Sequence, residues 1–73
     1  MVTKTVELNI PASFKDEPIF YQIIKSFKVV PNILEASFST EMGWAIVKIE
    51  GKQEELERLF SFLREKGVQI NVR

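Results

Sequence analysis

The residues with the clearest capacity for chemistry lie in one central stretch of the chain. Asn32 follows Pro31 and stands at the start of a predicted strand, where its side-chain amide offers two donors and one acceptor. Unpaired backbone groups at the start of a strand can add further hydrogen bonds. Trp44 lies on a strand that we expect to pair with the first. The alternative is that Asn32 is simply a turn residue after Pro31.

Residues suited to catalysis are missing or isolated. The chain has no His and no Cys, which excludes the commonest general base, a thiolate nucleophile, disulfides, and Cys-ligated metal or iron–sulfur sites. Ser37 and Ser39 have no histidine to act as their base. The carboxylates show no spacing that requires catalysis, and there is no glycine-rich phosphate loop. We therefore predict that the chain is not an enzyme and holds no catalytic residues, metal or cofactor.

Charge and length narrow the classes of partner. Ten basic and ten acidic residues cancel, so the chain lacks the positive surface of a nucleic-acid binder or of a protein that binds anionic membranes. No apolar run approaches the roughly 20 residues of a membrane span, and the N-terminus does not resemble a signal peptide. We expect a single domain, residues 1–73, in the cytoplasm. A domain this small buries little surface, so pairing with a second copy would stabilise it.

The spacing of apolar residues predicts six elements in the order β-α-β-β-α-β. The expected strands cover about residues 5–10, 32–40, 44–50 and 68–72, and the expected helices run from Asp16–Pro18 to before Val30 and from 53 to 66. Gly43 is expected to supply the turn between the central strands, and Gly67 to end the second helix. With right-handed crossovers, this order gives an α+β sandwich of the ferredoxin-like type. Its four-stranded antiparallel sheet has the strand order 4-1-3-2, with two helices on one face.

The sheet face that the helices leave uncovered should carry three large apolar residues. Alternation along the strands places Ile33, Trp44 and Ile46 there among polar neighbours, whereas Leu34 and its same-face neighbours are expected to face the core. Trp44 alone can bury some 150–250 Å². Such a cluster suggests a binding surface or a dimer interface. The alternative is a set of exposed apolar residues without a role.

The tryptophan strand also partly matches an RNA-binding pattern. The segment 42–49 has the spacing of the octapeptide in RNA-recognition motifs, and Gly43, Trp44, Ala45 and Val47 match it. The leading basic residue and the second and third aromatic residues do not. Glu7 stands where the first strand would need an aromatic residue, and stacking on RNA needs several aromatics and positive charge. We therefore predict no nucleic-acid partner.

Several segments together resemble one known family. Asp16-Glu17-Pro18, Asn32-Ile33-Leu34 and the segment from Phe62 to Ile70 agree in order and spacing with the NIL domain, which is named for its Asn-Ile-Leu triplet. The resemblance covers essentially the whole chain and implies an ACT-related, ferredoxin-like fold. In that family the domain pairs with its copy and binds methionine in ATP-binding subunits of methionine importers. It also occurs fused to iron–sulfur ferredoxin domains.

The resemblance implies a function for the central stretch. It implies a non-catalytic regulatory domain that forms a homodimer and binds a small amino acid, most plausibly methionine, at the dimer interface. Asn32, Ile33 and Leu34 are then the ligand-binding residues, and Ile33, Trp44 and Ile46 are the interface residues. The implied partner is a transporter or an iron–sulfur protein of sulfur metabolism. The alternative is a structural or assembly module of a ferredoxin-type protein that binds no small ligand.

Overall fold

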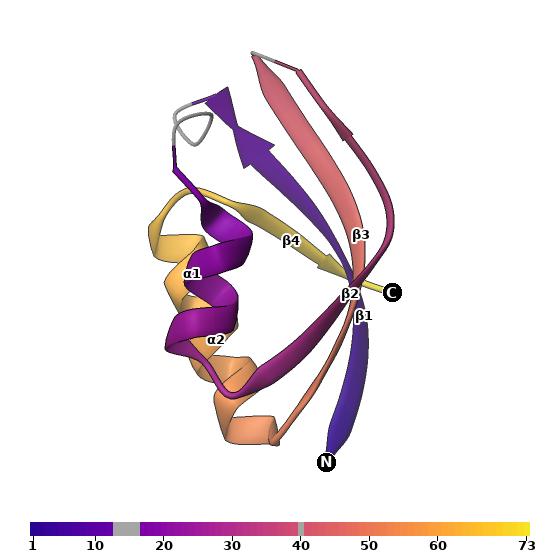
Figure 1. The fold of residues 1–73 in the computed structure, drawn as a ribbon, viewed down its shortest axis with the longest axis vertical. Coiled ribbons are helices and arrows are strands. Elements are labelled where there is room, and N and C mark those ends of the chain that lie inside the picture. The colour runs from indigo at the N-terminus through magenta and orange to yellow at the C-terminus, as the bar shows by residue number, and fades with distance from the viewer. Residues whose placement is uncertain (13–16, 40) are drawn as a thin grey trace.

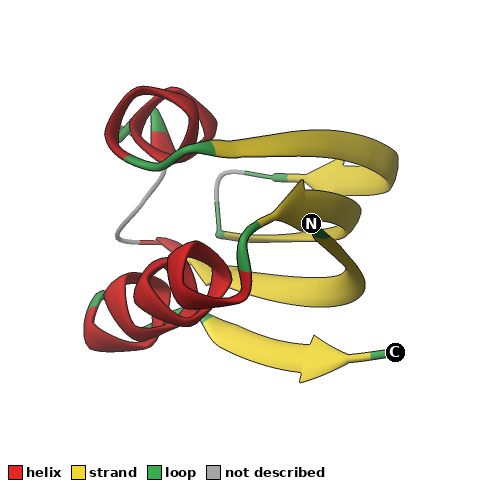
Figure 2. Ribbon diagram, turned by 90° about the horizontal axis from the view of Figure 1, so that it is seen from below, coloured by secondary structure: helices red, strands yellow, loops and turns green. Residues whose placement is uncertain are grey.

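The computed structural model describes residues 1–12, 17–39 and 41–73, so the expected helix start at Asp16 lies outside the described residues. The elements are β1 (Val2–Pro11), α1 (Ile19–Ser26), β2 (Val29–Phe38), β3 (Met42–Gly51), α2 (Gln53–Glu65) and β4 (Gln69–Val72). The strands form one sheet in the order β2-β3-β1-β4, and all neighbouring strands are antiparallel. Both helices lie on the same face of this sheet (Figure 1). Figure 2, turned by 90° from that view, shows the helix layer beside the sheet layer. The predicted ferredoxin-like sandwich with strand order 4-1-3-2 is confirmed.

The core lies where alternate side chains of the central strands meet one stripe of each helix. Val6, Leu8 and Ile10 of β1 are at most 5% exposed, and the residues between them are only partly buried. The remaining buried members from β3 and α2 are Ala45, Val47, Ile49, Leu56, Leu59, Phe60 and Leu63. Burying a Leu, Ile or Val side chain fully contributes about 1.5–3 kcal/mol, so this alternation fixes which sheet face meets the helices.

The C-terminal end of α2 is held by backbone hydrogen bonds. Gly67 has a φ of 92°, which glycine adopts without strain, and its amide donates to the Arg64 carbonyl at 3.0 Å. The amide of Val68 donates to the Leu63 carbonyl at 3.0 Å, which completes a Schellman motif. The prediction that Gly67 ends this helix is confirmed.

A carboxylate on α2 holds the connection between α1 and β2. Oε2 of Glu55 accepts a hydrogen bond from the backbone amide of Lys28 at 2.9 Å, and its Oε1 pairs with Arg58. These contacts favour the ionised form, so the Lys28 amide first and Arg58 second lower the pKa of Glu55 from its ordinary value. No helix in the described part of the chain is long and apolar enough to span a membrane.

Strand β2 begins earlier than predicted. It starts at Val29, and Pro31 lies inside it, although the sequence favours a boundary at this proline. A proline is tolerated in β2 because this strand is at the edge of the sheet, where a backbone N–H can be dispensed with. Asn32 therefore lies within the strand, and the prediction that it stands at the start of a strand is wrong.

Candidate functional site

Asn32 lies on the face of the sheet that the helices leave uncovered. It is exposed and stands directly opposite Lys48 of β3, so the two side chains share one face. Trp44 and Ile46 of β3 lie on the same face, where Ile46 is two residues from Lys48. The structure therefore places Asn32 on the same face as two of the three predicted interface residues.

Ile33 and Leu34 do not join this group, because β2 contains a β-bulge. Ile33 pairs with the buried Val47, whereas the next paired position on β2 is Glu35, opposite Ile46. Leu34 is thus an extra residue. Beyond it, the odd-numbered and even-numbered residues of β2 exchange the sheet faces to which they point. Ile33 lies on the helix side of the sheet and is 48% exposed. The prediction that it shares a face with Trp44 and Ile46 is wrong.

The bulge also changes the expected place of Leu34. The sequence places it in the core, but it is 54% exposed at the sheet edge. Ala36 and Phe38 do lie on the helix side, as predicted, opposite Ala45 and Gly43. They remain exposed there, so this end of β2 does not contribute to the core.

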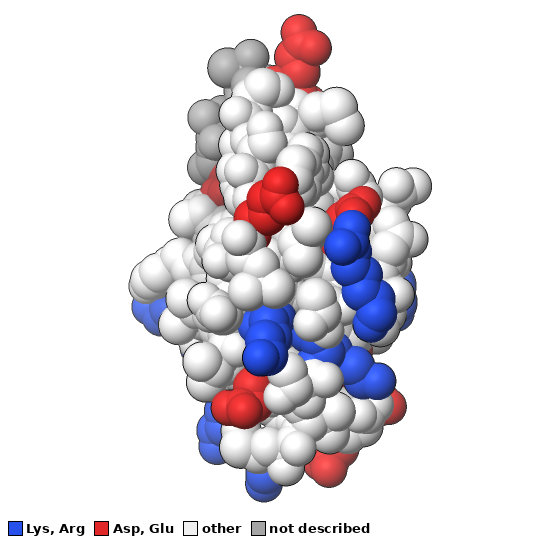
Figure 3. Space-filling view, turned by 90° about the vertical axis from the view of Figure 1, so that its right-hand side faces the viewer, with Lys and Arg blue, Asp and Glu red and all other residues white. Residues whose placement is uncertain are grey.

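Trp44 and Ile46 are half-buried in the middle of the uncovered face. Trp44 stands between Asn9 and Ser37, and Ile46 stands between Glu7 and Glu35. Figure 3 shows the molecule from the side away from the helices, where basic and acidic groups are interspersed over a largely uncharged surface. This face therefore combines apolar area with separate charges of both signs.

The group has the chemistry to recognise a free amino acid. The ammonium of Lys48 and the amide of Asn32 can hold a carboxylate, and the carboxylate of Glu35 can hold an ammonium. Ile46 and Trp44 offer apolar surface to a side chain. Glu7 on the same face is already paired with Arg73, at 3.0 Å between Oε2 and the guanidinium. Lys48 and Glu35 were not among the predicted site residues. Strand alternation along β3 places Lys48 on the face of Ile46, but Glu35 shares a face with Asn32 only because of the bulge.

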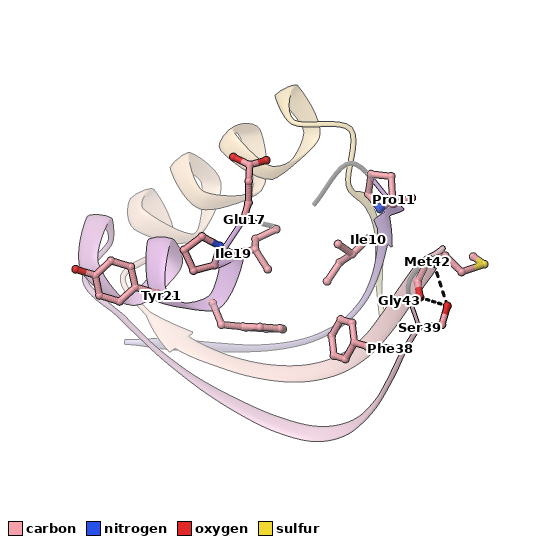
Figure 4. A pocket seen from close by; sticks show the side chains of 12 residues that line it. Ile10, Pro11, Glu17, Ile19, Tyr21, Phe38, Ser39, Met42 and Gly43 are labelled. Atoms are coloured by element: carbon pink, nitrogen blue, oxygen red, sulfur yellow. Dashed lines mark hydrogen bonds between the residues drawn. The ribbon is translucent and has the colours of Figure 1, made fainter. Parts of the chain in front are cut away.

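A separate hollow lies on the helix side, between α1 and the tip of the β2–β3 hairpin. This hairpin pocket has a volume of about 550 Å³. It is lined by Ile10, Pro11, Ala12, Glu17, Pro18, Ile19, Phe20, Tyr21, Phe38, Ser39, Met42 and Gly43. Figure 4 shows side chains from α1, β1 and the hairpin around one space. Sequence reasoning missed this pocket, because it assigned Phe38 to the core and Gly43 to the turn.

Gly43 has a packing role instead of the predicted turn role. Among the described residues only Gly67 has a positive φ. A Cβ on Gly43 would lie 2.1 Å from Cδ1 of Phe38, so the glycine leaves room for this ring to lie against β3. At the turn, the Ser39 hydroxyl accepts from the amides of Glu41 and Met42, at 3.2 Å each, and donates to the Met42 carbonyl at 3.0 Å.

The fold and the candidate site define a small ferredoxin-like α+β domain whose uncovered sheet face carries polar, charged and apolar groups. More particularly, the chain belongs to the NIL domain family, whose sequence profile matches residues 4–72. The predicted family is thereby confirmed.

Relatives of the chain occur both as short proteins and as parts of longer ones. An uncharacterised protein of Synechococcus elongatus is 26% identical over 73 residues, which cover 96% of this chain and 90% of that protein. The methionine import ATP-binding protein MetN 1 of Bacillus cereus is 33% identical over 69 residues, which cover 89% of this chain. The chain spans only 20% of that longer relative.

A solved structure supports the fold. The C-terminal domain of an ABC transporter ATP-binding protein from Enterococcus faecalis superposes with a TM-score of 0.80, at 19% sequence identity. The match covers 94% of this chain and 81% of that domain. At this level of identity the likeness concerns the fold alone, because one fold serves many functions.

Proposed function

We propose that this chain is a non-catalytic regulatory domain that binds a small amino acid, methionine in the first instance, between two copies of itself. Its output is a transporter ATP-binding subunit or a partner in sulfur metabolism, and its place is the cytoplasm. The observation that carries the proposal is membership of the NIL family together with 33% identity to a methionine import ATP-binding protein.

The geometry of the uncovered face supports this function. Asn32, Lys48 and Glu35 supply hydrogen bonds and charges of both signs, which is what the two ends of a zwitterionic amino acid require. Ile46 and Trp44 supply apolar surface for the side chain of methionine. The hairpin pocket does not include Asn32. A second copy packed on this face would enclose a ligand that one sheet leaves open to water.

Binding regulates a partner only if it favours one arrangement over another. For this domain the two arrangements are separate copies and paired copies. A ligand held between two copies binds only the pair, so it shifts the equilibrium toward the pair by a free energy that grows with the ratio of the free ligand concentration to its Kd.

The test is titration calorimetry of the chain with L-methionine, with norleucine as a ligand that lacks the thioether sulfur. We expect saturable heat with methionine. Asn32→Ala should weaken binding by about ten- to a hundredfold, because a hydrogen bond to a charged group contributes about 1.5–3 kcal/mol. The matched control is Asn71→Ala, an exposed amide on β4 at the other edge of the sheet, which should leave the affinity unchanged.

Two outcomes would contradict the proposal. If millimolar methionine produces neither heat nor a thermal shift, the methionine assignment is wrong. If sedimentation shows a monomer at every concentration, with and without methionine, the dimer is wrong. A stable dimer without methionine binding would favour the alternative, an assembly module for a ferredoxin-type protein.

A further inference from the structure

We propose that the hairpin pocket is a second binding site, separate from Asn32, and that it takes a small neutral apolar molecule. The proposal goes beyond the amino-acid site, because the pocket lies on the opposite side of the sheet and is lined by different residues.

Two aromatic rings form one wall of the pocket. Phe20 of α1 and Phe38 of β2 meet edge to face, with ring centroids 6.3 Å apart. Phe38 is nevertheless 54% exposed, so this contact leaves much of the ring open. Gly43 sets the position of the ring, because any larger residue there would occupy the space of its Cδ1 atom. The sequence thus holds a large apolar ring beside the pocket without burying it in the core.

The floor and rim of the pocket offer few hydrogen bonds. Ile10 and Ile19, at 5% and 6% exposed, close its floor. Pro11 and Pro18 on the rim have no backbone N–H to donate. The Ser39 hydroxyl, which also lines the pocket, is engaged in the turn through the Met42 carbonyl. A ligand in this space would therefore meet mainly carbon.

The charge beside the pocket argues for a neutral ligand. Among the described residues that line the pocket, Glu17 carries the charge, and Oε1 of its carboxylate lies 3.6 Å from Nζ of Lys66. In Figure 4 this carboxylate points away from the rings of the pocket. An anion would be repelled by Glu17, and a cation would have to compete with Lys66 for it.

The size of the pocket fits a small molecule. Ligand pockets of proteins have volumes of about 300–1,000 Å³ and are lined mainly by apolar and aromatic side chains. The hairpin pocket, at about 550 Å³ with two phenylalanine rings, has both properties.

The experiment uses N-phenylnaphthylamine, a neutral fluorophore that brightens in apolar surroundings, added to the folded chain. We expect a saturable increase in emission with one site per chain. Phe38→Ala removes one of the two rings of this wall and should weaken binding at least about tenfold. Gly43→Ala should weaken binding in the same direction, because it displaces the ring while leaving Phe38 in place. The matched control is Leu34→Ala, which removes an equally exposed apolar side chain of the same strand outside the pocket.

The outcomes separate this proposal from the amino-acid site. No saturable emission with the unaltered chain, or equal weakening by Leu34→Ala and Phe38→Ala, would overturn it. Probe binding that appears only when sedimentation shows a dimer would also overturn it, since the pocket would then be a contact between copies. Methionine binding is measured by calorimetry and depends on Asn32, whereas probe binding is measured by fluorescence and depends on Phe38. Either proposal can therefore be contradicted while the other is supported. Far-UV circular dichroism checks that each variant is folded.

Discussion

Replacing Gly43 by Ala tests whether the hairpin tip is built around the ring of Phe38. The new Cβ would lie 2.1 Å from Cδ1 of Phe38 and 2.7 Å from Cε1, whereas ordinary van der Waals contact begins at 3.4 Å. Because Phe38 is 54% exposed, its ring can swing into solvent and the strands need not separate. We therefore expect a folded variant in which the ring of Phe38 no longer packs against β3 and Phe20.

The size of the effect follows from what the ring loses. A fully buried Phe covers roughly 200 Å², so a little under half of this is roughly 90 Å², worth about 2 kcal/mol at about 25 cal/mol per Å². The edge-to-face contact with Phe20 adds about 0.5–1.5 kcal/mol. Alanine gains about 0.5–1 kcal/mol over glycine within a strand. We expect Gly43→Ala to lower the free energy of unfolding by about 2 kcal/mol.

Urea unfolding followed by the fluorescence of Trp44, the single tryptophan, measures this change. The decisive control is the same substitution in a Phe38→Ala background, where no ring is left to displace. There Gly43→Ala should be neutral or slightly stabilising, so the two substitutions should couple by about 2–3 kcal/mol. An equal loss in both backgrounds would refute the reasoning, because the cost would then come from the β3 backbone.

Two further predictions concern Glu55 and the bulge. Since the Lys28 amide and Arg58 lower the pKa of Glu55 from 4.5, the stability it contributes is present above about pH 4.5 and is lost as the pH falls through the lowered value. The stability difference between the chain and Glu55→Gln, measured by urea unfolding at several pH values, should therefore shrink in acid; a difference independent of pH would contradict this. Deletion of Leu34 should weaken both methionine and probe binding, because it removes the bulge, whereas Leu34→Ala should weaken neither. If the deletion weakened the binding of only one of the two ligands, the two sites would not both depend on the bulge.

The order and the core of the fold could be predicted because their signals are local and repeated. In α2, Leu56, Leu59 and Leu63 recur at helical spacing, and Gly67 follows at the position where a left-handed residue ends a helix. In β1, polar and apolar residues alternate from Thr5 to Ile10. Each of these patterns is compatible with one orientation of the helix or strand, since the opposite orientation would expose its apolar residues to water.

The second strand could not be predicted in the same way, because its tertiary position overrides the local signal. Pro31 indicates a boundary, yet an edge strand accepts it. The bulge at Leu34 has no marker in the sequence, since Ile33, Leu34 and Glu35 are all residues that fit an ordinary strand. Once the bulge was missed, the predicted face of Ile33 was wrong.

That single bulge determines the chemistry of both faces of β2. Asn32 precedes it and lies opposite Lys48 on the uncovered face. If the strand continued regularly from Asn32, Glu35 would point to the helix side, and Phe38 would point to the uncovered face. The extra residue reverses these two directions. Glu35 therefore lies on the face of Asn32 and Lys48, and Phe38 packs over Gly43 on the helix side. The polar, charged group and the apolar hairpin pocket are therefore two consequences of one irregularity in the backbone.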